Sequence, residues 1–218
     1  MTVNNFSNNN SILNRFISEL RDVHIQGDKF RFRKNIERIG EVMSYEISKT
    51  LKYKTIDVQT PLGVKSVSVP DEQIVLATIL RAGLPFHQGF LSYFDNAENA
   101  FISASRVYSA DHSAFDIELG YLSSPSIEGK TLLFIDPMLA TGSSIDLGYQ
   151  ALLQYGNPLK IHLACVIAAR QGIEAACKIF PESKTTIWVG DIDPDLNDKA
   201  YIVPGLGDAG DLSFGEKI

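Results

Sequence analysis

Residues 131–144 read TLLFIDPMLATGSS, and this stretch decides the fold. Its first five residues include no charged group, which is typical of a strand covered on both faces of a parallel sheet. Asp136 follows the strand, and a short loop containing Gly142 leads into a segment with apolar residues at helical spacing. That segment ends near Gly156, and glycine commonly stops a helix. The stretch therefore predicts a buried strand, a loop and a helix in direct succession.

The same alternation recurs on both sides of this stretch from residue 73 onward. Short runs rich in β-branched and aromatic residues alternate with segments of helix length. These runs are QIVLATIL at 73–80, AFISASRVY at 100–108, IHLACVIAA at 161–169 and TTIWVG at 185–190. Such alternation predicts an α/β fold with a mostly parallel sheet flanked by helices.

The first third of the chain has a different pattern. Apolar residues recur at helical spacing over residues 12–23 and again over residues 28–47, so we expect two N-terminal helices. Residues 53–70 form two alternating runs around Pro61 and Gly63, a pattern that predicts a β-hairpin arm.

Both ends of the chain lack such periodicity. The Asn-rich residues 1–10 are expected to be a flexible arm. Residues 191–218 are rich in Gly, Pro and Asp, so we expect a functional loop cap, which we name the hood. Domains commonly run to roughly 100–200 residues, and we therefore expect residues 1–218 to form a single domain.

Composition and charge exclude several classes of protein. Hydrophobic residues make up 44% of the 218 residues and charged residues 21%, which excludes a disordered or collagen-like chain. The net charge of −6 argues against a nucleic acid partner. No stretch approaches the roughly 18 apolar residues of a membrane span, and two cysteines are too few for a disulfide framework. We therefore expect a cytoplasmic protein with neither a nucleic acid nor a membrane partner.

The loop after the central strand has the chemistry of a phosphate site. Thr141, Ser143 and Ser144 supply hydroxyl donors, and Gly142 permits close approach to the backbone. Free amides at the start of the following helix attract an anion such as a phosphomonoester. Asp136, just upstream, is placed to meet the hydroxyls of a sugar attached to that phosphate. The alternative is a Ser/Thr helix cap that binds no ligand.

Three motifs then carry a family resemblance. The segment DPMLATGSS at 136–144 resembles the phosphoribosyl pyrophosphate motif of type I phosphoribosyltransferases. In its Asp-Pro form, together with ILRAG at 79–83 and YIVPGLGDAGD at 201–211, it is similar to the uracil phosphoribosyltransferase family. The segment RFRKNIERIGEVMSYE at 31–46 also resembles that family, and the motifs follow the family's order.

The resemblance implies both a fold and a reaction. The fold is that of the type I phosphoribosyltransferases, with N-terminal helices, a β-hairpin arm and a C-terminal hood that binds the base. The reaction converts uracil and 5-phosphoribosyl 1-pyrophosphate to UMP and pyrophosphate, with Mg²⁺ held mainly through the pyrophosphate. Such enzymes form homodimers or homotetramers, and GTP activates some of them, so we keep GTP as a candidate activator.

Site residues carry over from the resemblance one by one. Arg81 and Asp136 are the implied catalytic residues: Arg81 lies in the loop that holds the pyrophosphate, and Asp136 binds the ribose hydroxyls. The residues implied to hold the ribose 5-phosphate are Asp136, Pro137, Met138, Leu139, Ala140, Thr141, Gly142, Ser143 and Ser144. The residues implied to contact uracil are Ile202, Gly207, Asp208 and Ala209, of which Asp208 also faces the phosphoribosyl substrate.

The chemistry of these segments agrees with that reaction. Uracil presents an acceptor, a donor and an acceptor along one edge, and a loop of small residues can offer backbone N–H and C=O groups to it. The expected transition state is oxocarbenium-like, so preorganised charges are needed and a covalent nucleophile is not.

The chain departs from the family pattern at one cation. The family has Tyr-Arg after the strand at 100–107, and that Arg contacts pyrophosphate, whereas here Tyr108 is followed by Ser109. Strand alternation would aim Arg106 to the same face as Tyr108, so Arg106 is a candidate replacement. Arg170 is the second candidate.

Two other functions therefore stay open at this point. One is an RNA-binding pyrimidine regulator on the same fold, and the other is a catalytically weak homologue that binds nucleotide. The acidic charge balance and the complete uracil-type segment favour the enzyme.

Overall fold

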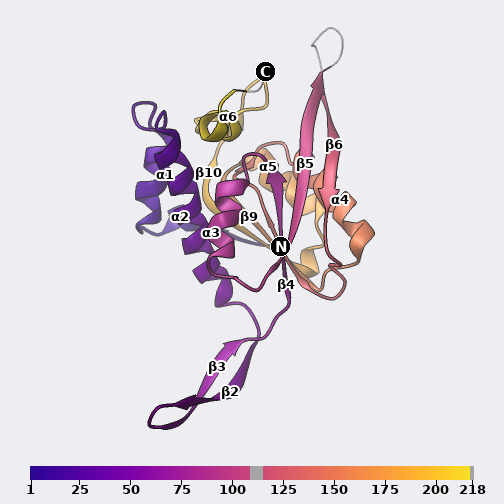
Figure 1. Cartoon of the computed structure of the whole chain (residues 1–218). Helices are drawn as coiled ribbons and strands as arrows, with labels where there is room; N and C mark the ends of the chain where they lie inside the picture. Colours follow the sequence, from indigo (N-terminus) through magenta and orange to yellow (C-terminus); the bar gives the residue numbers. More distant parts are fainter. Residues whose placement is uncertain (109–114, 217–218) are drawn as a thin grey trace.

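The sheet and its helices are described for residues 1–108 and 115–216 by a computed structural model, and the side chains of residues 105–108 and 115–118 are left undescribed (Figure 1). In the described part, the strands of the sheet lie in the order β1-β10-β9-β7-β4-β5-β6, and β8 also pairs with β9. Their bounds are β1 Thr2–Asn5, β4 Ile74–Leu80, β5 Glu98–Tyr108, β6 Phe115–Ser123, β7 Thr131–Ile135, β8 Met138–Leu139, β9 Lys160–Ala169 and β10 Thr185–Asp193. Every pairing is parallel except that of β5 with β6, which confirms a mostly parallel sheet.

The stretch TLLFI becomes β7, and it lies inside the sheet between β4 and β9. All five of its side chains are buried, as the absence of polar alternation predicts. The strand therefore brings Asp136 to the carboxyl edge of the sheet, where loops and ligands are accessible in parallel α/β folds.

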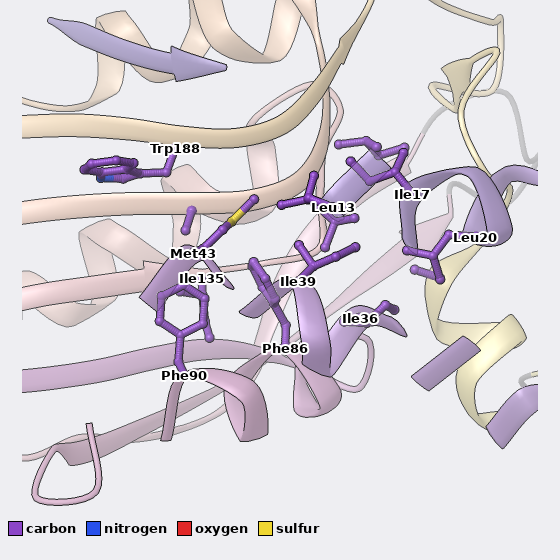
Figure 2. Close-up of a cluster of buried hydrophobic side chains, with 14 of the residues drawn as sticks. Leu13, Ile17, Leu20, Ile36, Ile39, Met43, Phe86, Phe90, Ile135 and Trp188 are labelled. Atoms are coloured by element: carbon purple, nitrogen blue, oxygen red, sulfur yellow. The ribbon is translucent and has the colours of Figure 1, made fainter. Parts of the chain in front are cut away.

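Helices cover both faces of the sheet. Their bounds are α1 Leu13–Arg21, α2 Lys29–Ser48, α3 Leu84–Leu91, α4 Ser143–Leu152, α5 Arg170–Ile179 and α6 Ala209–Phe214. One face carries α1, α2 and α3, whose buried side chains pack against Ile135 and Trp188 of the sheet (Figure 2). The other face carries α4 and α5, with Tyr149 and Phe180 in contact at a ring-centroid distance of 4.4 Å.

The winding direction of the chain reverses between β4 and β7. From β4 the chain passes through α3 to β5 on one side, and from β7 it passes through α4 to β9 on the other. A crevice opens at such a reversal, outside the carboxyl ends of the two strands, and ligands of doubly wound sheets bind there. The loop at residues 80–83 and the loop at residues 136–142 both begin at this crevice.

The first residues correct an expectation from the sequence. Residues 1–10, predicted as a flexible arm, contain β1, which pairs in parallel with Thr186–Val189 of β10. Asn5 then caps a short 3₁₀ helix, and the ring of Phe6 stacks against Trp188 at 6.1 Å. Thr2 and Val3 favour a strand whereas Asn4 and Asn5 do not, so this edge strand is held by backbone pairing with its one neighbour and by one aromatic contact beside it.

The segment at 53–70 forms a hairpin of β2 (Tyr53–Thr60) and β3 (Gly63–Pro70), paired from Tyr53↔Pro70 to Thr60↔Gly63. Figure 1 shows it projecting away from the sheet. Most of its residues are exposed, and the tip residue Leu62 is fully so.

The hood contains a small antiparallel pair, β11 (Asp195–Leu196) with β12 (Ile202–Val203), followed by α6. Figure 1 shows α6 beyond the carboxyl ends of the central strands. The hood therefore lies above the edge of the sheet at which β7 delivers Asp136.

A buried carboxylate joins the two N-terminal helices. Asp28 caps α2 by accepting from the Arg31 N–H. Arg31 in turn forms a bidentate pair with Glu19 of α1, both bonds being 2.8 Å, and Arg15 and Asn35 donate to the same carboxylate. Arg31, Arg15 and Asn35 together hold the pKa of Glu19 well below its ordinary value.

No helix in the described part of the chain is both long enough and apolar enough to cross a membrane.

We predict that Glu19→Gln lowers the free energy of unfolding at pH 7 by about 2 kcal/mol, the scale of hydrogen bonds to a charged group. The lowered pKa means that the unfolded chain binds more protons below pH 4.5, the ordinary value of Glu. The contribution of Glu19 is therefore present at neutral pH and is lost as the pH falls below 4.5. Chemical denaturation at several pH values measures both effects.

The matched control is Glu46→Gln, because Glu46 pairs with Lys49, the residue after α2, and both side chains are partly exposed. This change should cost less than about 0.5 kcal/mol. Equal losses in the two variants would contradict the role assigned to Glu19.

Candidate functional site

A cavity of about 120 Å³ lies where the loop after β7 meets the hood. Its walls come from two distant parts of the sequence, and they place the predicted phosphate loop opposite Asp208. The lining residues are Asp136, Met138, Leu139, Ala140, Thr141, Gly142, Ser143, Ser144, Ile145, Ala200, Tyr201 and Asp208. Of the residues predicted for the phosphoribosyl group from Asp136 to Ser144, only Pro137 is not part of this wall.

The loop ends at the N-terminus of α4. Gly142 precedes the helix with φ +85°, a left-handed conformation that favours glycine. The Thr141 hydroxyl oxygen accepts from the Ser143 N–H at 3.3 Å and lies 2.9 Å from the Ser143 hydroxyl. The first-turn amides of a helix have no partner within it, so they and two hydroxyl groups face the cavity together. This arrangement suits a phosphate. The Thr141 hydroxyl oxygen occupies only the Ser143 N–H, so other first-turn amides stay available to bind one.

The backbone of the loop at 136–142 is held by hydrogen bonds to β9 and by packing against α5. The Pro137 carbonyl oxygen accepts from the N–H groups of Val166 and Ile167, both at 3.1 Å, and β8 continues the pairing with β9. Gly172 of α5 packs so closely that a methyl group there would overlap the carbonyl oxygens of Leu139 and Ala140. The sequence analysis does not identify Gly172, because its need for close approach arises only from the tertiary contact.

Asp136 faces the cavity from the end of β7. Burial raises its pKa from an ordinary value of 3.8 to about 8, so the unliganded carboxyl group is largely protonated at neutral pH. The pKa of the Cys165 thiol nearby is also raised, first by burial and then by Asp136. A thiol of raised pKa is a poor nucleophile, in agreement with chemistry that needs none.

The hood contributes Asp208 to the cavity. One oxygen of its carboxylate caps α6 by accepting from the N–H groups of Gly210 at 2.8 Å and Asp211 at 3.0 Å. This cap fixes the direction of Asp208, which lines the cavity beside Ala200 and Tyr201. Neither of these two is among the residues that the resemblance assigns to uracil.

The other predicted uracil residues lie just behind this wall. Ile202 and Ala209 are buried, with 3% and 2% of their surface exposed, and neither lines the cavity. Gly207 adopts φ +89° and borders a second hollow beside Asp208. The structure thus brings Asp208 alone of the four into the cavity.

Arg81 lies at the neighbouring strand end but is directed toward the hood. One of its terminal nitrogens, Nη2, lies 3.1 Å from the Gly215 carbonyl oxygen and 3.3 Å from Asp211 Oδ1. Its Nε is buried without a hydrogen-bond partner among the described residues. The turn that follows is tight, because a methyl group at Gly83 would overlap the Thr78 hydroxyl.

Arg106 and Arg170 are the two candidates to replace the family's Arg, which is absent at Ser109. Arg106 lies in β5, but its side chain is outside the described part of the structure, and so is Ser109. Arg170 is exposed at the first position of α5 and is absent from the cavity wall. The choice between Arg106 and Arg170 stays a prediction.

Comparisons with known proteins decide the family. The family model described as uracil phosphoribosyltransferase matches residues 7–216. The chain belongs to the uracil phosphoribosyltransferase family. A member of this family from Porphyromonas gingivalis is 57% identical over 208 residues, covering 95% of each chain. Another, from Sulfolobus acidocaldarius, is 36% identical and covers 94% of this chain and 96% of its own.

Solved structures agree with the family fold. A protein from Aquifex aeolicus superposes with a TM-score of 0.87 at 30% identity over the full length of both chains. A hypoxanthine phosphoribosyltransferase from Staphylococcus aureus has a TM-score of 0.50 at 17% identity, covering 86% of this chain and 83% of its own. This second likeness concerns the fold alone, and it confirms the type I phosphoribosyltransferase architecture.

We predict that Asp136→Asn lowers turnover by roughly 100-fold, as expected for the loss of a transition-state electrostatic contact. The same change should stabilise the fold. Between pH 3.8 and about 8, folded Asp136 retains a proton that the unfolded chain releases, so Asp136 makes stability fall as the pH rises.

Thermal melts between pH 4 and pH 8 test this prediction. The melting temperature of Asp136→Asn should exceed that of the parent at pH 8, and the difference should shrink toward pH 4. A variant that is less stable at pH 8, or one with near-normal turnover, would contradict the role of Asp136.

Proposed function

We propose that this chain transfers the phosphoribosyl group of 5-phosphoribosyl 1-pyrophosphate to uracil, giving UMP and pyrophosphate. One observation carries the proposal: a single cavity is bounded by the phosphate-type loop at 136–144 and by hood residues Ala200, Tyr201 and Asp208. A transferase must hold a sugar phosphate and a base against each other, and this wall offers a surface for each. Membership in the uracil phosphoribosyltransferase family supports the choice of base.

In this assignment, the 5-phosphate binds at the start of α4. The first-turn amides and the hydroxyls of Thr141, Ser143 and Ser144 donate to its oxygens, and the helix dipole favours its charge. Gly142 lets the phosphate approach the backbone closely. The ribose then lies over the loop, within reach of Asp136.

The chemistry of Asp136 follows from its burial. Ribose hydroxyls that donate to the carboxylate favour the ionised form, so substrate binding should draw the pKa down from about 8. The ionised carboxylate then lies close to the positive charge that develops on the ribose in an oxocarbenium-like transition state. In a water-poor site this charge pair is worth more than in bulk water.

The pyrophosphate would leave toward the loop at residues 80–83. Arg81 carries the positive charge there, and its contacts with Asp211 and Gly215 would exchange for pyrophosphate oxygens. The contacts of Arg81 with Asp211 and Gly215 connect the pyrophosphate loop to α6 of the hood. Departure of pyrophosphate would therefore change the contacts of the helix that covers the base.

Mg²⁺ would enter with the substrate. Among residues 1–108 and 115–216 there is no group of three or more His, Cys, Asp or Glu side chains arranged to hold a metal ion. Mg²⁺ commonly binds phosphate oxygens and water through one or two carboxylates. The donor set of the cavity, with Asp136 and Asp208, fits an ion carried by the pyrophosphate, which would neutralise the charge of the leaving group.

Uracil would lie under the hood. The backbone around Ile202 and Gly207–Ala209 would offer N–H and C=O groups to its edge, and Asp208 would face both the base and the ribose. The rival functions, RNA binding and weak nucleotide binding, lack a supporting observation in the described part of the structure. Activation by GTP and a cytoplasmic location stay predictions.

We predict that uracil is used and cytosine is refused. Cytosine carries an amino group at C4 and a bare N3, so two pairings made by uracil would become donor–donor or acceptor–acceptor. Each unpaired buried group costs about 1–3 kcal/mol, and sites built on substrate hydrogen bonds can discriminate by ~10⁴-fold. Pyrophosphate release with each base measures this ratio.

The Ala209→Val variant, measured in the same assay, tests whether uracil binds at the hood. Ala209 is 2% exposed, so the added methyl groups must displace the hood backbone next to Asp208. Uracil use should weaken, and binding of ribose 5-phosphate should persist. Comparable turnover of cytosine by the parent, or unchanged uracil kinetics in Ala209→Val, would place the base elsewhere.

We also predict a homodimer or a homotetramer. An isolated hairpin is marginally stable in water, yet β2 and β3 extend from the body with Leu62 and Val64 exposed at 101% and 65%. A second copy of the chain would cover these side chains. Light scattering at micromolar concentration should give at least twice the mass of one chain, and Val64→Asp should lower it. A monomeric parent protein would refute the prediction.

A further inference from the structure

Arg21, at the C-terminal end of α1, contacts the hood directly. Its Nη1 donates to the Gly205 carbonyl oxygen and to Asp193 Oδ2, both at 2.8 Å. Its Nη2 donates to Asp193 Oδ1 and to Asp191 Oδ2, both at 2.9 Å. Each terminal nitrogen carries two hydrogens, so every hydrogen on these two nitrogens has one acceptor.

The Gly205 peptide is held from both sides. Its carbonyl accepts from Arg21, and its N–H donates to Asp193 Oδ2 at 3.2 Å. Gly205 adopts φ +61°, and a methyl group there would overlap the Ile202 carbonyl oxygen. The conformation of this peptide is therefore set by the charged pair and by the turn.

A second side chain from the same region extends this support. Gln26 Nε2 donates to the Leu206 carbonyl oxygen at 3.2 Å and to the Leu20 carbonyl oxygen at 2.8 Å. Two consecutive hood carbonyls, those of Gly205 and Leu206, are thus bound from the N-terminal helical region. The next residue is Gly207, where the segment assigned to the base begins.

Stability alone is a poor account of this cluster. Arg21 is 19% exposed and Asp193 6%, and two carboxylates face a single guanidinium. Apolar replacements of buried ion pairs are often neutral or stabilising, so a buried pair is weak evidence for a role in stability. The planar fork of Arg21 holds four acceptor atoms of three residues at once, and one of them is the Gly205 carbonyl oxygen.

We propose that Arg21 is a positioning residue for the base: with Asp193 it orients the Gly205 peptide, and through it the turn at Gly207–Ala209. This inference rests on the proposed function, because it requires that the hood binds uracil. Arg21 is absent from the cavity wall and acts through the hood backbone.

The test compares Arg21→Lys and Asp193→Asn with Asp191→Asn. A lysine keeps the charge but loses the fork, and Asp193→Asn weakens the clamp on Gly205. Asp191 also accepts from Arg21, but the Gly205 N–H donates to Asp193, so Asp191→Asn is the matched control. We expect KM for uracil to rise roughly 10-fold in the first two variants, on the scale of misplaced binding groups. The kcat of these variants should change little, and their discrimination of uracil over cytosine should fall.

Calorimetric titration with 5-phosphoribosyl 1-pyrophosphate and thermal melting show whether the phosphate site and the fold survive. A merely structural role would reduce the active fraction, and with it kcat, and would leave KM and base discrimination unchanged. That pattern, or equal KM effects in Asp191→Asn and Asp193→Asn, would overturn the inference.

Ala209→Val separates this inference from the proposed function. If Ala209→Val leaves uracil kinetics unchanged, the hood is not the base site and the proposed function fails at that point. If Ala209→Val weakens uracil use and Arg21→Lys does not, the site stands and Arg21 is not its positioning residue.

Discussion

The site depends on the complete burial of one strand. Both edges of β7 pair with neighbouring strands, and both faces are covered, so no residue within it can meet a ligand. The first residue after this strand that lines the cavity is Asp136. The loop at 136–144, the start of α4 and the hood lie around this position because β7 ends there, beside the reversal between β4 and β7.

Burial has a consequence for the carboxyl group itself. Burial disfavours the charged form of Asp136 and raises the pKa of its carboxyl group, at the position where the proposed reaction would use a negative charge. Functional sites commonly combine a strained or desolvated group with rigid support. Here the support is close backbone packing, with Gly172 under the loop and Gly205 inside the hood. Both are positions where only a missing side chain allows the contact.

The sequence predicted the parts of the fold that depend on local pattern. The buried strand TLLFI, the alternating strands and helices and the hairpin are all visible in periodicity or turn residues. The strand β1 was not predictable, because its Asn-rich residues are ordered by pairing with β10, more than 180 residues away. The same reason applies to Ala200, Tyr201 and Arg21, whose positions at the site or behind it come from tertiary contacts. The family resemblance predicted Asp208 as a site residue. The structure shows that its side chain is oriented by capping α6.

The central claim is that the sugar phosphate binds on the loop after β7 and the base binds under the hood, on the two sides of Asp208. A crystal structure of this protein with UMP tests it most directly. The account predicts the phosphate on the amides and hydroxyls of Thr141–Ser144, the ribose hydroxyls on Asp136 and the uracil edge on the backbone of Gly207–Ala209. A phosphate bound away from the start of α4, or a base outside the hood, would contradict it.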